Sequence, residues 1–112
     1  MSKPSILTAS PLRRYKFGEF TLTVLGDIDT QDKVNYRYIL AVVQGEDPEP
    51  GLYLTAEQVD GEDLGRRIMM RDGDQVIGHS GGWRELDNFV DESIRIVSQV
   101  LNLSDETPYQ LM

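Results

Sequence analysis

A single serine stands among glycines in the segment Gly-His-Ser-Gly-Gly, residues 78–82. This G-x-S-x-G spacing is typical of a serine held on a sharp turn between a strand and a helix, where its hydroxyl is exposed and can attack a carbonyl. The alternating apolar residues before the segment and the helical spacing after it fit that local context. Nucleophilic attack also needs a general base that takes the hydroxyl proton and a third group that orients the base.

The five-residue spacing resembles the nucleophile elbow of the α/β-hydrolases, in which the acid and then the histidine follow the serine along the chain. Here the only histidine, His79, comes immediately before Ser80, and all three lysines lie far upstream of it. The residues before the motif also lack the strand–helix alternation of a parallel α/β sheet. We therefore predict no catalytic residues, and serine hydrolysis ranks third among the functions considered.

The same segment has a structural interpretation. A strand that turns sharply into a helix needs glycines for unusual backbone angles and a small polar N-cap, which Ser80 or Gly82 can provide. The free amides of such a turn can also hold an anion such as phosphate. Two arginines can assist in holding the anion. Arg84 follows the turn closely along the chain, and Arg66 would lie opposite His79 in the predicted hairpin. The candidate anion site comprises His79, Ser80, Gly81, Gly82, Arg84 and Arg66.

Carboxylates gather in three polar stretches, at residues 27–32, 46–49 and 60–63. Such groups are the ligands of calcium and magnesium, but none of the stretches has the residue order of an EF-hand loop. The chain has no cysteine, and one histidine cannot build a zinc site without carboxylate help. We interpret the acidic stretches as solvated turns and predict no metal and no cofactor.

Composition places the chain among small acidic domains. Its 112 residues predict one domain, and 39% hydrophobic residues are enough for a core. The net charge of −8 argues against nucleic acid, because lysine and arginine supply most of the affinity for phosphates. No run approaches the roughly 20 apolar residues of a membrane span, and residues 1–10 do not form a signal peptide. With no cysteine, a cytoplasmic location is expected.

Apolar residues alternate over much of the chain before residue 80, which predicts an antiparallel sheet. Strands are expected around 15–17, 20–24, 34–43 and 52–57, with a hairpin formed by 67–71 and 75–79. The dipeptide Asp72-Gly73 favours a type I′ turn in that hairpin. With this turn, Ile68 faces Ile77 and Met69 faces Val76.

The stretch 34–43 is the strongest strand. Tyr36, Tyr38 and Leu40 fill one face, and the opposite face is also apolar from Ile39 onward. A strand that is apolar on both faces lies in the centre of a sheet and is covered on each side. A helix can cover one side, and either a second copy or the curl of the sheet covers the other. The predicted interface residues are Ile39, Ala41, Val43 and Met69.

After residue 82 the apolar period becomes helical. We predict a helix from the Ser80–Gly82 turn to Asn102, with Asn102 in the left-handed conformation and an Asp91–Arg95 ion pair. Residues 1–11 read as a flexible lead-in, and residues 104–112 as a tail that docks through its last apolar side chains. The predicted apolar stripe contains Trp83, Leu86, Phe89, Val90, Ile94, Val97, Val100 and Leu101.

These elements predict an α+β fold: an antiparallel β-meander of about five to six strands packed on one long C-terminal amphipathic helix. The leading function is a non-enzymatic interaction domain that binds a second copy of itself or another protein. The alternative is a small-ligand or anion-binding domain that uses the Gly78–Gly82 turn.

Overall fold

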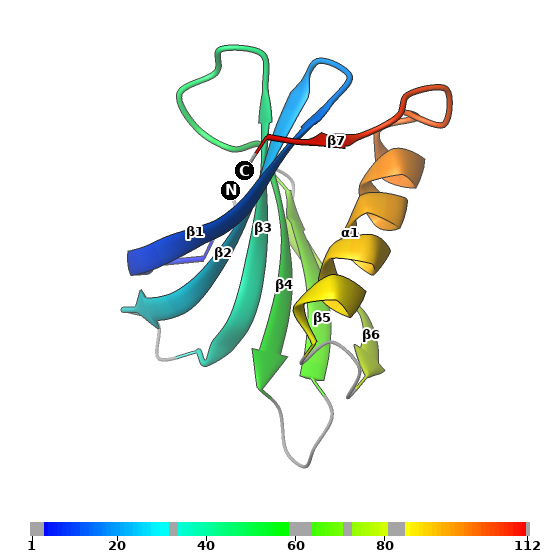
Figure 1. Cartoon of the computed structure of the whole chain (residues 1–112). Helices are drawn as coiled ribbons and strands as arrows, with labels where there is room; N and C mark the ends of the chain where they lie inside the picture. Colours follow the sequence, from blue (N-terminus) through cyan, green and yellow to red (C-terminus); the bar gives the residue numbers. More distant parts are fainter. Residues whose placement is uncertain (1–3, 32–33, 59–63, 71–72, 81–84, 112) are drawn as a thin grey trace.

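The computed structural model describes residues 4–31, 34–58, 64–70, 73–80 and 85–111. These residues form an antiparallel sheet with one helix lying against it (Figure 1). The elements are β1 (Ile6–Phe17), β2 (Phe20–Thr30), β3 (Tyr36–Gln44), β4 (Leu52–Gln58), β5 (Leu64–Met70), β6 (Gly73–Ser80), α1 (Leu86–Val100) and β7 (Tyr109–Gln110).

The strand order is β6-β5-β4-β3-β2-β1-β7, so the first six strands form a meander and the last strand adds beside the first. The predicted combination of an antiparallel sheet with one helix is confirmed. Two details differ from the prediction. The described strands number seven, and α1 is followed by β7 rather than ending the chain.

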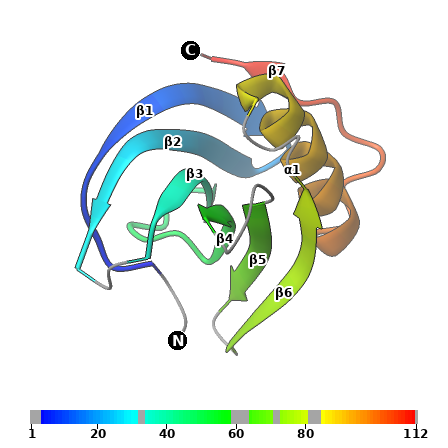
Figure 2. The ribbon, with the colours of Figure 1, turned by 90° about the horizontal axis from the view of Figure 1, so that it is seen from below.

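The amino-terminal part of the chain was expected to be a flexible lead-in, but β1 begins at Ile6. The alternation of apolar residues did not reveal this strand, because the β1–β2 pair has three register shifts, the last between Pro11 and Arg13. Each shift interrupts the alternation by which a strand is recognised, and it also increases the local bend. Figure 2 shows the result, in which β1 and β2 curve around the rest of the sheet.

The core lies between α1 and one face of the sheet. β3 is the fourth of the seven strands and is apolar on both sides, as predicted for a central strand. Alternate residues of β3 pack toward the helix, and Ile39 on the other face is also fully buried. The buried core residues that the sheet and α1 contribute are Tyr15, Phe17, Leu22, Val24, Tyr38, Leu40, Val42, Leu52, Leu54, Ala56, Phe89, Val90 and Val97.

α1 is shorter at its start than the predicted helix. Ser80 belongs to β6, where it pairs with Leu64, and the N-cap is Glu85, whose side chain makes no capping hydrogen bond. Gly82 and Trp83 lie outside the described residues. Val100, assigned to the apolar stripe, is 42% exposed.

The end of α1 follows the prediction. Asn102 has φ +57°, and the N–H of Leu103 donates to the carbonyl of Ser98 at 2.8 Å. This is the Schellman arrangement, which satisfies a carbonyl at the end of the helix. On the exposed face of α1, Arg95 pairs with Glu92 instead of the predicted Asp91.

The β5–β6 hairpin has a different register from the predicted one. Met70 pairs with Gly73, so residues 71–72 connect the strands and Gly73, at φ +144°, already belongs to β6. Ile68 therefore faces Gln75 instead of Ile77, and Met69 faces Asp74 instead of Val76. Glycine can begin a strand at this φ because it has no Cβ.

The carboxyl-terminal tail docks through its backbone. β7 pairs with Tyr15 and Lys16 of β1, and the N–H of Leu111 donates to the carbonyl of Arg14 at 2.7 Å. Tyr109 and Leu111, which were expected to anchor the tail, have exposed side chains. Met112 lies outside the described residues.

Candidate functional site

Arg66, one of the predicted anion ligands, is only 1% exposed and lies beneath α1. Its Nη2 donates to the carbonyl oxygen of Phe89 at 3.2 Å and to the hydroxyl of Ser93. Its guanidinium carbon lies 4.8 Å from the centre of the Phe89 ring. Burial lowers the pKa of Arg66 to about 10. Arg66 thus joins β5 to the helix, and its partner across the hairpin is Gly78 rather than His79.

The rest of the predicted anion site falls mostly outside the described structure. Gly81, Gly82 and Arg84 are not among the described residues. The backbone of His79 pairs with Gly65, and that of Ser80 pairs with Leu64. The side chains of these two residues are also outside the described part. The anion site therefore remains a prediction.

Three of the four predicted interface residues are buried within the single chain. These are Ile39, Ala41 and Met69, while Val43 is half-buried. In Figure 2, the amino-terminal end of β1 curls toward the face of the sheet opposite α1. Cover by a second copy is not needed for these three side chains.

The sheet face opposite α1 also contains buried polar groups that the alternation did not reveal. Thr55 is fully buried, and its hydroxyl donates to a carboxylate oxygen of Glu57 at 3.1 Å. The same oxygen lies 3.3 Å from Nε of Arg67. This side of the sheet is therefore closed partly by a hydrogen-bonded ion pair, which a purely apolar contact surface would not contain.

The β5–β6 hairpin carries exposed apolar side chains in β6 and at the end of β5. Val76 is 49% exposed and Ile77 is 39% exposed, and Met70 is similarly accessible. β6 is the outermost strand on its side of the described sheet. Val76 and Ile77 are therefore the exposed apolar side chains that this hairpin offers beside the outer edge of the described sheet.

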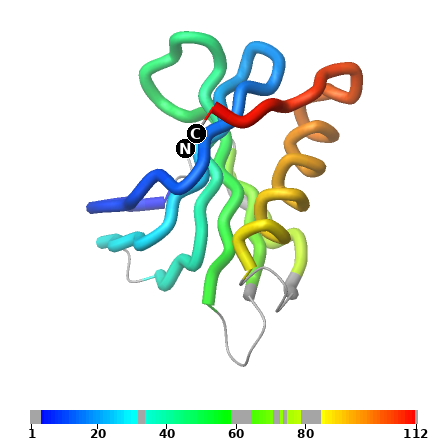
Figure 3. The backbone as a smooth tube through the Cα atoms, viewed as in Figure 1, coloured from blue at the N-terminus to red at the C-terminus, as the bar shows by residue number. Residues whose placement is uncertain are grey.

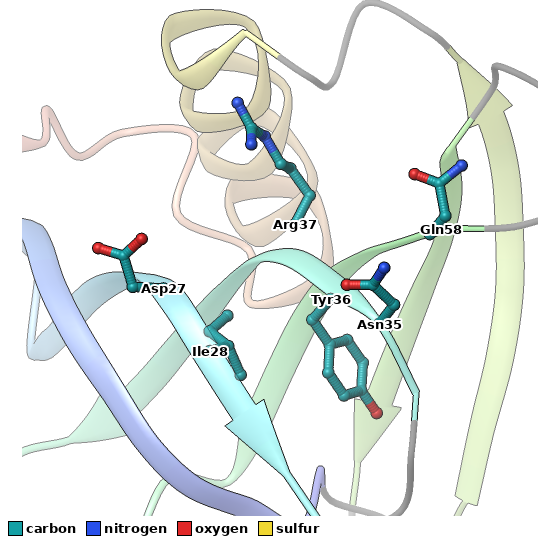
Figure 4. Close-up of a pocket in the computed structure, with 6 residues that line it drawn as sticks. All are labelled: Asp27, Ile28, Asn35, Tyr36, Arg37 and Gln58. Carbon is teal, nitrogen blue, oxygen red and sulfur yellow. The ribbon is translucent and has the colours of Figure 1, made fainter.

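A polar cavity of about 330 Å³ lies where β2 and β3 separate (Figure 4). The pairing of these strands ends at Leu25 with Ile39, whereas β3 remains paired with β4 as far as Tyr36. Asp27 stands just beyond the last β2–β3 pair at φ +49°, and this left-handed residue changes the direction of β2. We call this cavity the fork pocket. It is lined by Asp27, Ile28, Asn35, Tyr36, Arg37 and Gln58.

The fork pocket is lined by two opposite charges and by two carboxamides. Asp27 and Arg37 are both exposed, and their head groups project to the same side of the strands in Figure 4. The guanidinium carbon of Arg37 lies 5.2 Å from the centre of the Tyr38 ring. The N–H of Gln58 donates to the carbonyl of Asn35 at 2.8 Å, which fixes the opposite wall.

Sequence reasoning missed the fork pocket. Asp27 was assigned to a solvated turn, and Arg37 to the polar side of a strand. The only signal was the polar run after residue 26, which does not reveal that the two strands part there.

The described residues contain no group of three or more His, Asp or Glu side chains placed to hold a metal ion. The described helix is too short and too polar to cross a membrane. Comparisons with protein-family models, curated proteins and solved structures find no match. Function must therefore be argued from the surfaces described above.

Proposed function

We propose that this chain is a small non-enzymatic interaction domain that forms a homodimer through β6. In this dimer, β6 of one copy pairs antiparallel with β6 of a second copy. The observation that carries the proposal is the exposure of Val76 and Ile77 in the middle of an outermost strand. The backbone groups along such an edge can pair with another strand.

The composition of the hairpin supports this choice of surface. Natural edge strands are often protected by lysine or proline, and β6 contains neither. Residues 64–80 contain three arginines and two aspartates, in a chain with a net charge of −8. Two acidic copies repel each other least where their surfaces are least acidic.

The geometry of antiparallel pairing favours a second copy over an unrelated partner. A twofold axis perpendicular to the sheet places a residue opposite its own counterpart. If Val76 lies on this axis, then Gln75 lies opposite Ile77 of the second copy. Val76 then meets Val76 of the second copy, so the more exposed of the two apolar side chains is covered across the axis.

Sedimentation equilibrium of the full chain tests the proposal, with Val76→Lys as the disrupting variant. A lysine in the middle of the edge places like charges beside each other across the twofold axis, so we expect a dimeric wild type and a monomeric variant. Val100→Lys is the matched control, because Val100 has comparable exposure and lies on α1. We expect this control to remain dimeric.

Circular dichroism of both variants establishes that they keep the fold of the wild type. A wild type that stays monomeric at its highest soluble concentration would contradict the proposal. So would a Val76→Lys variant that dimerises as strongly as the Val100→Lys control.

A further inference from the structure

We propose that the fork pocket binds a small zwitterion of the α-amino acid type. Arg37 binds the carboxylate of this ligand, and Asp27 binds its ammonium group. The inference is independent of β6, because it rests on the opposite charges that β2 and β3 present where they separate.

The backbone at Asp27 creates the pocket. A left-handed conformation costs most L-residues free energy, although aspartate and asparagine adopt it more readily than others. Here it occurs just beyond the last β2–β3 pair, where β2 turns away while β3 continues along β4. The opening is therefore a consequence of the strand path and does not depend on a loop rearrangement.

The size of the pocket fits a small metabolite. Its volume of about 330 Å³ is at the lower end of the range for small-molecule sites. That space corresponds to roughly ten water molecules at about 30 Å³ each. A free amino acid fits within this volume.

The lining chemistry selects for two opposite charges on one ligand. A guanidinium can hold a carboxylate through two parallel hydrogen bonds, and a carboxylate accepts hydrogen bonds from an ammonium group. The carboxamides of Asn35 and Gln58 can each donate and accept, so they suit either end of the ligand. A simple anion would face Asp27 and a chain of net charge −8, and a simple cation would face Arg37.

An NMR titration of the ¹⁵N-labelled full chain tests this inference with L-alanine as the zwitterion. Acetate and ethylamine serve as the single-charge probes. We expect L-alanine to shift the backbone amides of residues 27, 28 and 35–37 and the side-chain amides of Asn35 and Gln58. The two single-charge probes should bind at least about tenfold more weakly, since each forms only one of the two charge-assisted contacts.

Variants separate the roles of the two charges. Asp27→Asn and Arg37→Gln should each weaken L-alanine binding by at least about tenfold. Asparagine tolerates the left-handed backbone at position 27, so the first variant should preserve the pocket. The matched controls are Asp29→Asn and Arg14→Gln, because both residues are exposed and neither lines the pocket. These controls should bind like the wild type.

Three results would overturn the inference. The first is the absence of L-alanine shifts at these residues. The second is acetate or ethylamine binding as tightly as L-alanine, which would indicate a site for a single ion. The third is unchanged L-alanine affinity in both Asp27→Asn and Arg37→Gln, with the wild-type spectrum retained elsewhere.

Discussion

Replacing Arg66 by methionine or by alanine tests how the chain tolerates a guanidinium beneath its helix. Arg66 is fully buried between β5 and α1, where one of its nitrogens donates to Phe89 and Ser93. Methionine keeps most of the volume of the side chain but removes its charge and its donors. Alanine removes the charge, the donors and most of the volume.

The structure sets the expected magnitudes. Burial lowers the pKa of Arg66 well below its ordinary value, to about 10, so the folded chain disfavours the charged form by about 3 kcal/mol at about 1.4 kcal/mol per pKa unit. Losing the hydrogen bonds that this charged donor makes to Phe89 and Ser93 costs about 1.5–3 kcal/mol each. Arg66→Met should therefore lower the free energy of unfolding by no more than about 3 kcal/mol. Arg66→Ala should lie about 3 kcal/mol below Arg66→Met, because it leaves a cavity.

Urea unfolding followed by far-ultraviolet circular dichroism measures both variants. Equal slopes against urea concentration are required, because only then do the midpoints report stability. Ser93→Ala is a useful companion, since it removes the hydroxyl acceptor of Arg66 and leaves the guanidinium in place. It should lower the free energy of unfolding by about 1–3 kcal/mol. The reasoning is refuted if Arg66→Met is as unstable as Arg66→Ala, which would mean that the buried charge itself stabilises the fold.

Two further predictions concern Tyr53 and Asn102. Burial, and then the charge of Glu49, raises the pKa of the Tyr53 phenol above its ordinary value. Tyr53→Phe should therefore remove a late-titrating component from the phenolate absorbance. Glu49→Gln should move this component of the absorbance to lower pH. The stability contributed by the neutral phenol is present below pH 10 and is lost as the pH rises through the raised pKa; an unchanged titration curve in Tyr53→Phe would contradict the assignment. Because Asn102 has φ +57°, Asn102→Gly should be nearly neutral in thermal unfolding, whereas Asn102→Val should cost about 1–2 kcal/mol. Equal melting temperatures for the two variants would show that the left-handed cap contributes little.

The sequence predicted the elements whose burial is regular. β3 was recognised as central because its residues are apolar at consecutive positions, and this pattern requires cover on both sides. The end of α1 was recognised from Asn102, because the left-handed cap depends on residues that are neighbours in sequence. Both predictions rest on local information.

The parts that could not be predicted depend on contacts between distant residues or on irregular backbone. Bulges hid the strand character of residues 6–11, and Gly73 shifted the β5–β6 register by joining the strand. The burial of Arg66 requires knowledge of where α1 crosses β5. Predicting the fork pocket requires knowing that the pairing of β2 with β3 stops beyond Leu25. The alternation of apolar residues within one strand does not show which strands it pairs with or where the pairing ends.

The position of β7 has a consequence for how the molecule assembles along its chain. Every other strand pairs with its immediate neighbour in sequence, whereas β7 must find Tyr15 and Lys16 across most of the chain. Closing so long a loop costs about 2 kcal/mol more than closing a ten-residue hairpin, and only a two-residue ladder offsets it. We therefore expect β7 to join last during folding and to detach first. A chain shortened before Pro108 would keep the meander but have an open edge at each end. Such a chain could add copies head to tail into open-ended arrays, whereas the dimer proposed above closes as a pair.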